Sequence, residues 1–322
     1  MGPLPLCGAS RRSTLGRVAP GTGCGRSPMI IDCHVHVGKL HEHYPEWWVA
    51  ELYRAWGGVR QWGGGQDQTV GERMVGMMEE HGIDMMCIMT SDHRRVYPDR
   101  KGPYCPNDFL LEVKETAPER FALTCSVDPL RDVYEAIQEV ERCIKELGIN
   151  AVKVYPSYDH FDPRDPQLWP LYEKIIELDI PMQCHMGWTP CLNAPMKYQF
   201  PYLLDEVAYR YPDLKIVVCH LGWPWVDECM ALIARYENVH ADLAYWGWFT
   251  PEENLRIIQR FGRLCGFDKL LFGSENSHTD MAVELMLGLR QEAERLGLEP
   301  IAEEDMEKIM WKNTARLWKI EG

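Results

Sequence analysis

The chain has 322 residues, 46% hydrophobic and 25% charged, so it is long enough and apolar enough to bury a full core. Its formal net charge is −14 and it shows no clustered Lys and Arg of the kind that binds phosphate backbones, which argues against a nucleic-acid partner. The twelve cysteines are scattered through a long chain. We therefore expect free thiols and a cytoplasmic protein rather than a disulfide-rich secreted one.

The first 28 residues are rich in Gly, Pro, Ser and Arg and precede the first apolar run. The pair Arg11-Arg12 lacks the apolar segment that an export signal requires. We expect residues 1–28 to be a disordered extension, and two readings stay open: translation that starts at Met29, or a translated tail. Because no apolar run reaches the roughly eighteen residues that a membrane span needs, no membrane association is expected.

From Met29 onward, short apolar runs alternate with segments of helical period, which is typical of βα units around a parallel sheet. The runs are Met29 to Cys33, Ile83 to Thr90, Phe121 to Val127, Ala151 to Tyr155, Ile180 to Cys184, Lys215 to Cys219, Val239 to Leu243 and Leu270 to Gly273. This number of strands closes a parallel barrel. We therefore predict an α/β fold in which residues 29–322 form a single (β/α)8 TIM-type barrel domain.

Segments that have helical periodicity, or residues typical of helix ends, separate or follow these runs. They are residues 132–147, 166–178, 224–236, 251–261, 280–296, 302–311 and 313–320. Two connections, Val37 to about Gln68 and Ser91 to Pro106, are longer than usual. Long loops after barrel strands lie over the catalytic face, so these two are expected to shape substrate binding.

Imidazole and carboxylate side chains stand where apolar runs end. His34 and His36 follow the first run, His185 the fifth and Glu275 the eighth. The carboxyl ends of barrel strands meet on one face of the barrel. A divalent transition metal in a catalytic site binds imidazole nitrogens and a carboxylate and keeps one coordination position open. One strand-end histidine is more often structural, but four coincident positions predict a metal site.

Strand alternation also predicts the direction of the neighbouring side chains. His34 and His36 should point to the same side, whereas Cys33 and Val35 should point away. By the same parity, Cys184 and Cys219 should point away from the histidines that follow them.

Further candidate residues lie near these strand ends. His220 could be a ligand or an acid/base group beside the metal, and the second role is favoured. Lys153, on the fourth run, either is a modified lysine that bridges two metals or binds a substrate carboxylate, and we prefer the second reading.

Aromatic and guanidinium side chains complete the expected substrate site. Trp188 and Trp223 follow the fifth and sixth runs and predict flat apolar walls suited to a ring or conjugated chain. Arg54 and Arg60, in the first long connection, offer the planar two-point match that a carboxylate needs, as do Arg94 and Arg95 in the second. The remaining histidines, among them His93, are expected to be solvated or capping residues.

The chain from Met29 to its end resembles the amidohydrolase-related family of aminocarboxymuconate-semialdehyde decarboxylase and the metal-dependent benzoate-type decarboxylases. The stretches that carry the resemblance are IIDCHVHVG, AVKVYPSYDHFDPRDPQLWPLYE, IPMQCHMGW, YPDLKIVVCHLGWPWVDE, NVHADLAYW, DKLLFGSE and KNTARLW. The resemblance implies a TIM barrel with one divalent metal ion, zinc (Zn²⁺) or manganese (Mn²⁺). It makes His34, His36 and His185 ligands and gives His220 a catalytic role.

The family usually has GSD at the end of the eighth strand, whereas this chain has GSE. Glu275 is one methylene longer and could ligate the metal, handle protons, or do both. Altogether the resemblance implies a nonoxidative decarboxylase, that is, a carboxy-lyase, acting on a small aromatic or unsaturated carboxylic acid. Two alternatives stay open: a metal-dependent hydrolase of an ester, lactone or amide, and a non-catalytic metal- or ligand-binding barrel. A homodimer is expected by family analogy alone.

Overall fold

The structure is a computed structural model that describes residues 28–56, 68–97, 101–275 and 279–321. Eight strands form one sheet in sequential order, and every adjacent pair is parallel. They are β1 (Ile31–His36), β2 (Met85–Met89), β3 (Phe121–Ser126), β4 (Ala151–Val154), β5 (Met182–Cys184), β6 (Ile216–Val218), β7 (Val239–Asp242) and β8 (Leu270–Leu271). The first and last strands meet through backbone hydrogen bonds from Cys33 to Phe272 (3.0 Å) and from Glu275 to His34 (3.1 Å). The predicted (β/α)8 barrel is confirmed.

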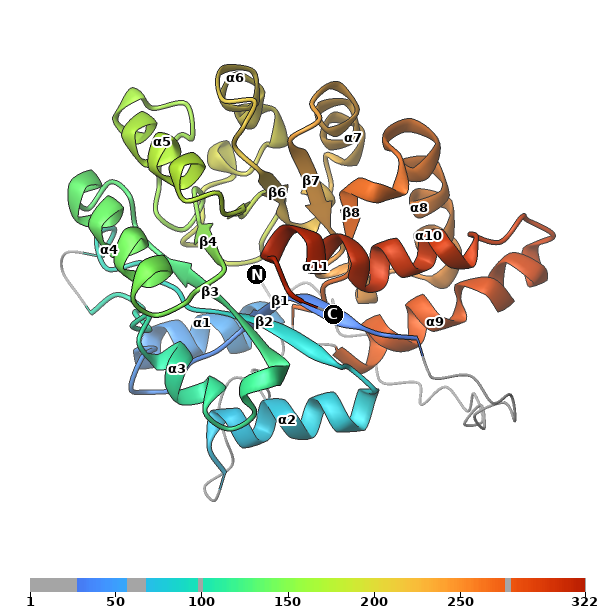
Figure 1. Ribbon diagram of the computed structural model, residues 1–322, viewed down its shortest axis with the longest axis horizontal. Coiled ribbons are helices and arrows are strands. Elements are labelled where there is room, and N and C mark those ends of the chain that lie inside the picture. The colour runs from blue at the N-terminus through green and yellow to red at the C-terminus, as the bar shows by residue number, and fades with distance from the viewer. Residues whose placement is uncertain (1–27, 57–67, 98–100, 276–278, 322) are drawn as a thin grey trace, which may run out of the picture.

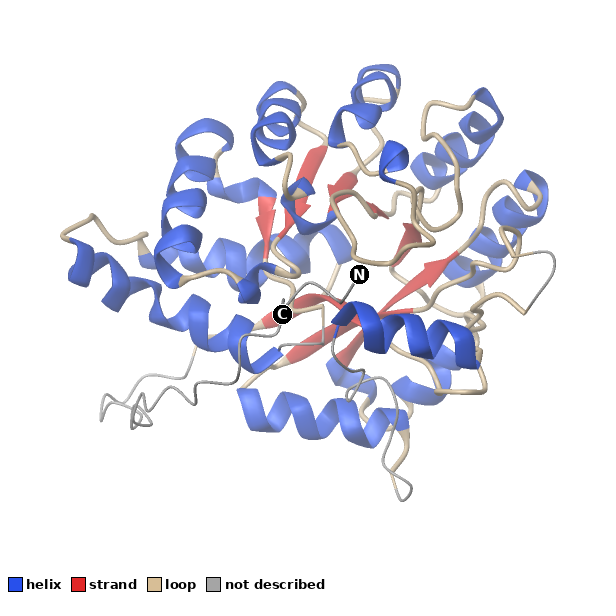
Figure 2. Ribbon diagram, turned by 180° about the vertical axis from the view of Figure 1, so that it is seen from behind, coloured by secondary structure: helices blue, strands red, loops and turns tan. Residues whose placement is uncertain are grey.

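Helices surround the strands on all sides (Figures 1 and 2). They are α1 (Glu46–Trp56), α2 (Val70–His81), α3 (Phe109–Lys114), α4 (Val133–Lys145), α5 (Trp169–Glu177), α6 (Asp205–Arg210), α7 (Val226–Arg235), α8 (Pro251–Cys265), α9 (Thr279–Leu296), α10 (Glu303–Glu307) and α11 (Asn313–Trp318), with the π-helix η8 (Lys308–Lys312) between the last two. Among the described residues, none of these helices combines the length and the hydropathy that a bilayer crossing requires.

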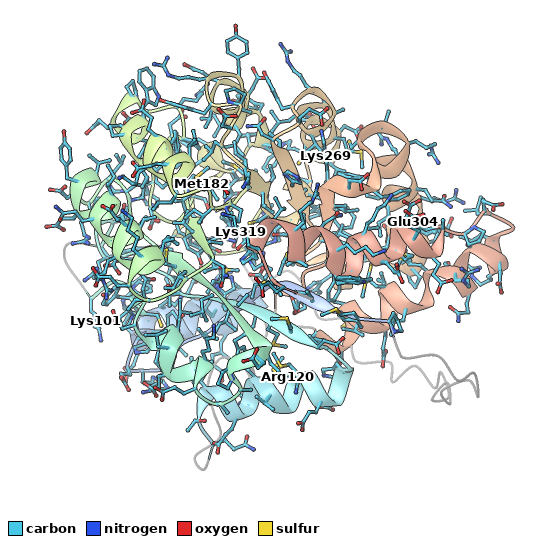
Figure 3. All side chains as sticks on the ribbon, in the orientation of Figure 1. Lys101, Arg120, Met182, Lys269, Glu304 and Lys319 are labelled. Carbon is cyan, nitrogen blue, oxygen red and sulfur yellow. The ribbon has the colours of Figure 1, made fainter. Side chains whose placement is uncertain are left out.

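Two hydrophobic clusters separate the inside of the barrel from its outer layer. The larger cluster packs strand residues against the helices, and Met182 of β5, labelled in Figure 3, belongs to it. The smaller cluster draws on strands from around the barrel: Ile31, Cys33, Cys87, Ala122, Ala151, Val217 and Leu271, together with Leu317 and Trp318. Residues of strands so widely spaced can touch one another only across the interior, so this cluster is the inner core.

Trp318 closes one end of that inner core. Its helix, α11, crosses the front of the barrel in Figure 1. The Trp318 side chain is fully buried, and its indole Nε1 donates a hydrogen bond to Thr124 Oγ1 of β3 at 3.1 Å. The C-terminal helix therefore supplies both apolar area and a satisfied polar contact to the floor of the barrel.

We predict that Trp318→Ala lowers the free energy of unfolding by about 3–5 kcal/mol, because it empties a fully buried aromatic site. Denaturant unfolding followed by circular dichroism measures this loss. Tyr209→Ala is the matched control, because that ring is 74% exposed. Similar losses in the two variants would contradict the assignment of Trp318 to the core.

Several predicted boundaries need correction. The first strand runs from Ile31 to His36 and not from Met29 to Cys33, so both histidines of the HxH motif lie inside the strand. The first long connection is not wholly a loop, because α1 occupies residues 46–56 of it. Its apolar residues Trp48, Val49 and Leu52 are buried, and this tertiary packing stabilises a helix in a segment whose many aromatic residues obscured the helical period.

The predicted directions of two cysteines are wrong. The pairing of β1 with β2 shifts register between Asp32 and Val35, so Cys33 joins the inner core although His34, next to it, also faces the interior. Strand β6 ends at Val218, and Cys219 begins the short helix η5 (Cys219–Gly222). Strand parity no longer applies there, and the Cys219 thiol points into the barrel.

His240 of β7 is a buried imidazole away from the predicted site residues. It is 6% exposed, and its Nδ1 has no hydrogen-bond partner among the residues the structure describes. Burial, with the charges of Arg316 and Lys269, lowers the pKa of His240 from 6.5 to about 4. Between these two pH values the unfolded chain binds a proton at this position that the folded chain does not, so acidification favours unfolding.

We predict that His240→Gln loses less stability than the unchanged chain when the pH falls from 7 to 5. The expected difference is on the order of 1–3 kcal/mol, because the variant lacks the group that must be kept uncharged. Urea unfolding at the two pH values measures it, and equal losses would contradict the buried neutral imidazole.

Candidate metal centre and active site

His34 and Asp242 form the best-defined contact of the site. His34 Nδ1 lies 2.9 Å from Asp242 Oδ2, and both side chains are fully buried. Burial is the main cause that lowers the pKa of His34 to about 4, so its imidazole is neutral. A neutral imidazole that donates from Nδ1 to a carboxylate presents an unprotonated Nε2 on its other side, which is the tautomer of a metal ligand.

Other donor atoms gather around His34 Nε2. His36 Nε2 lies 3.3 Å away and Glu275 Oε2 3.1 Å away, while His36 Nε2 is 3.4 Å from Glu275 Oε1. Imidazole nitrogens and a carboxylate gathered this closely are a donor set that a divalent transition metal prefers. The structure therefore brings together three of the four predicted ligands, from the end of β1 and from the segment after β8.

His220 and His185 adjoin this group. His220 Nδ1 is 3.3 Å from the carbonyl oxygen of Ala244 and 3.8 Å from Glu275 Oε2, and its Nε2 is 3.1 Å from His185 Nδ1. If the carbonyl accepts from His220 Nδ1, then His220 Nε2 accepts from His185 Nδ1. His185 Nε2 is left as a buried lone pair without a hydrogen-bond partner in the described part of the chain.

These observations fit a divalent transition metal. His34, His220 and Glu275 can each place one ligand atom within 4.8 Å of the others, and His36 lies beside them. The buried Glu275 Oε2, like His185 Nε2, makes no regular hydrogen bond among the described residues, although it lies in ion-pair range of His34. The assignment of His185 as ligand and of His220 as acid/base group stays a prediction.

The backbone at the two candidate catalytic residues is unusual. His220 has φ 61° and Glu275 has φ 62°, both in the left-handed region that L-residues rarely adopt. Between their two segments the packing is tight: a Cβ on Gly273 would lie 3.0 Å from the Cβ of His34 and 3.3 Å from that of Ala244. Strained residues held by close packing are typical of functional sites.

Lys153 lies inside the barrel, directly beside the ligand cluster. It is fully buried, with Nζ 2.9 Å from Cys219 Sγ and 3.2 Å from His34 Nε2. The thiol and the nearby carboxylates of Asp242 and Glu275 raise the pKa of Lys153 against the opposing effect of burial, so it is a fixed positive charge. The side chain points into the barrel, and its role as a substrate-binding residue stays a prediction.

The predicted arginine clamps that the structure describes form ion pairs within the chain, and their role in binding a substrate stays a prediction. Arg54 pairs with Glu51 at 2.6 Å and donates to the carbonyl of Pro190. Arg94 pairs with Asp92 at 2.7 Å and Arg95 with Asp128 at 3.0 Å. Arg60 lies outside the described residues.

Trp188 and Trp223, the predicted aromatic walls, do come together. Their ring centroids are 5.5 Å apart in an edge-on arrangement, and Tyr245 extends the group 5.8 Å from Trp223. Tyr155 and Tyr158 lie on another side of the site, with ring centroids 6.3 Å and 5.0 Å from that of His185. Flat aromatic surfaces thus lie around the candidate ligands, and whether they contact a substrate stays a prediction.

Sequence reasoning missed Asp242. The residue ends β7, whose four residues are all buried, and that position could have marked it, because a carboxylate at the end of a buried strand needs a partner. Its Oδ1 accepts hydrogen bonds from the backbone nitrogens of His220 and Ala244 at 2.8 and 3.1 Å. The pKa of Asp242 is held far below its usual range, against burial, mainly by His34, so the carboxylate is ionised.

A barrel whose carboxyl-end face collects histidines and an acid from separate strands defines the class of metal-dependent barrel enzymes. The sequence pattern of the amidohydrolase family matches residues 31–320. The chain therefore belongs to the amidohydrolase family and is an enzyme, as the resemblance implied.

The names of the related proteins indicate more than one type of reaction. A 2-keto-4-carboxy-3-hexenedioate hydratase from Sphingobium sp. is 28% identical over 229 residues, which is 60% of this chain and 65% of the hydratase. This chain thus matches slightly less than two thirds of that relative's length. A gamma-resorcylate decarboxylase from Polaromonas sp. is 25% identical over 307 residues, covering 77% of this chain and 87% of the decarboxylase.

Solved structures agree with the fold. An uncharacterised TIM-barrel protein from Bordetella bronchiseptica superimposes with a TM-score of 0.70 at 21% identity, covering 91% of this chain and 99% of the other. A dihydroxybenzoic acid decarboxylase from Polaromonas sp., solved with manganese and the inhibitor 2-nitroresorcinol, has a TM-score of 0.61 at 20% identity, covering 91% and 97%. At these identities the likeness concerns the barrel itself.

We predict that Asp242→Asn weakens metal binding roughly 10–100-fold, because the amide no longer orients His34 as an ionised carboxylate does. Competition with a chelator of known affinity measures this for Zn²⁺ and Mn²⁺. Asp227→Asn, which removes an exposed carboxylate paired with Arg260, is the control. Equal affinity in both variants would refute the orienting role of Asp242.

Proposed function

We propose that this enzyme is a metal-dependent nonoxidative decarboxylase of a small aromatic or unsaturated carboxylic acid. The observation that carries the proposal is the convergence of His34, His36 and Glu275 with a fully buried lysine, Lys153, at one end of the barrel. A cluster of that composition binds a metal ion and an anionic substrate together. The decarboxylases among the related proteins support this reading.

The metal would be held by His34, His36, His185 and Glu275. It is a single divalent ion, Mn²⁺ or Zn²⁺; manganese in a decarboxylase of the same fold supports the first choice. When bound, it would supply a Lewis acid that attracts the oxygens of the substrate.

Residues of the chain itself would bind the anionic substrate and transfer the proton. Lys153 keeps a positive charge next to His34, which favours the binding of an anion at this end of the barrel. His220 and Glu275, with Nδ1 3.8 Å from Oε2, form the acid/base pair that carries a proton to the substrate. Once this pair has taken up a proton from solvent, the proton passes to the substrate carbon that bears the carboxylate. The bond to the carboxyl carbon then breaks, carbon dioxide leaves, and the electron pair of that bond returns to the ring.

Hydration of a conjugated double bond is a second candidate. Two observations favour it: a hydratase is among the named relatives, and Glu275 stands where the resembled decarboxylases usually have Asp. A longer carboxylate reaches further from the strand end and can take a proton from a water molecule that attacks carbon. Hydrolysis of an ester, lactone or amide would use the same groups, and a non-catalytic barrel would use none of them.

The test is to load the purified chain with Mn²⁺ or Zn²⁺ and to supply three substrate panels: hydroxybenzoates, unsaturated dicarboxylic acids and lactones. We predict carbon dioxide release from the first panel. We expect carbon dioxide release to disappear in His185→Ala. Loss of a group that only hydrogen-bonds to a metal ligand already lowers metal affinity or activity about 10–100-fold, so loss of a ligand itself costs more. His81→Ala, at the end of α2, is the control and should retain activity.

Other outcomes would redirect the assignment. A new hydroxyl group in the product without gas would replace decarboxylation by hydration, and free acid without gas would replace it by hydrolysis. No turnover in any panel, with one metal ion bound per chain, would favour the binding barrel.

A further inference from the structure

The metal ligands come from one part of the barrel, and a second buried cluster lies outside it. The ligand candidates lie in β1 and in the segments that follow β5, β6 and β8. The loops after β2 and β4 carry a histidine and an aspartate that the mechanism does not use. His93 and Asp159 are 3% and 0% exposed, and His93 Nδ1 lies 2.7 Å from Asp159 Oδ1.

The surrounding loops hold this pair in place. Arg95 binds the carboxylate of Asp128 after β3 at 3.0 Å and also donates to the backbone carbonyl of Asp159. The backbone nitrogen of His93 donates to the carbonyl of Pro103 at 2.9 Å. Three successive loops of the barrel thus fix the orientation of a single imidazole, which is more than a loop cap requires.

Aromatic rings connect the pair to the metal ligands. The His93 ring stacks on Tyr158 at 5.3 Å and meets the edge of Tyr155 at 4.9 Å. Tyr158 also lies 5.0 Å from His185, and Tyr155 lies 6.2 Å from His36. His93 and the candidate ligands therefore contact the same two tyrosine rings.

One atom of His93 is uncommitted. In the described part of the chain, His93 Nε2 makes no hydrogen bond. This nitrogen is also not completely enclosed by its surroundings. Burial raises the pKa of Asp159 well above its usual range and lowers the pKa of His93 to about 4. When the carboxyl group of Asp159 holds a proton and donates it to Nδ1, the hydrogen of the neutral ring lies on Nε2, which is then a donor.

We propose that His93 is a second substrate-binding residue, which donates a hydrogen bond from Nε2 to an acceptor group of the substrate remote from the reacting carboxylate. The inference rests on the proposed function, because it takes the metal end as the place of the first carboxylate. It narrows the substrate to acids with a second acceptor, best a second carboxylate, since hydrogen bonds to charged groups are the stronger ones.

The test measures binding rather than turnover. Isophthalate, a ring with two carboxylates, and benzoate, which has one, are titrated calorimetrically into the full chain loaded with Mn²⁺. The expected preference for isophthalate is about tenfold, from one hydrogen bond to a charged group. In His93→Phe we expect isophthalate to bind no better than benzoate, while the affinity for benzoate stays the same.

Two further variants separate recognition from structure. His93→Gln keeps an N–H donor and should retain part of the preference. His240→Gln removes a buried imidazole elsewhere in the barrel and should retain all of it. The inference is overturned if the unchanged chain shows no preference or binds neither acid, if His93→Phe keeps the preference, or if that variant weakens both acids equally.

Carbon dioxide release is recorded in parallel to keep the two hypotheses apart. Gas release without a preference for isophthalate overturns the role of His93 and leaves the decarboxylase. A preference that depends on His93, without gas release, supports the binding role and overturns the decarboxylase.

Discussion

The buried contact between His34 and Asp242 is the interaction on which the rest of the site depends. It joins β1 to β7 across the barrel interior and selects the tautomer that directs His34 Nε2 toward the other ligands. The second oxygen of Asp242 binds the backbone of His220 and Ala244, so one carboxylate positions a candidate ligand, a candidate proton donor and the carbonyl that orients it. An ionised carboxylate without these partners would be too costly to bury there.

The fold distributes its chemistry unevenly around the barrel. Strand β1 and the segments after β5, β6 and β8 bring nitrogen and carboxylate donors together, and His34, His220 and Glu275 among them could hold a metal ion. The loops after β2, β3 and β4 instead hold tyrosines and ion pairs. Closure of the sheet between β1 and β8 places both groups of loops at the carboxyl end of one barrel. The proposed chemistry and the proposed substrate recognition would then take place side by side.

Irregular backbone segments position several residues of the candidate site. The register shift in β1 lets Cys33 and His34 both reach the interior, which a regular strand forbids. His220 and Glu275 both have a left-handed backbone conformation, and their side chains meet, with Nδ1 3.8 Å from Oε2. Such conformations cost energy and persist only because neighbouring groups hold them, among them Asp242 on the His220 nitrogen and His34 on the Glu275 nitrogen.

The sequence by itself determined the strand count and the parallel barrel, because apolar runs are local properties. The residues that end those runs also made it possible to predict the candidate donor groups His34, His36, His185, His220 and Glu275. It could not reveal Asp242, the inward thiol of Cys219, or the pairing that commits Arg54, Arg94 and Arg95 to carboxylates of the protein. Those depend on contacts between residues far apart in the chain and on backbone turns that break strand parity. Only the closed tertiary structure decides which distant groups meet, because hydrogen bonds and ion pairs act over a few ångströms.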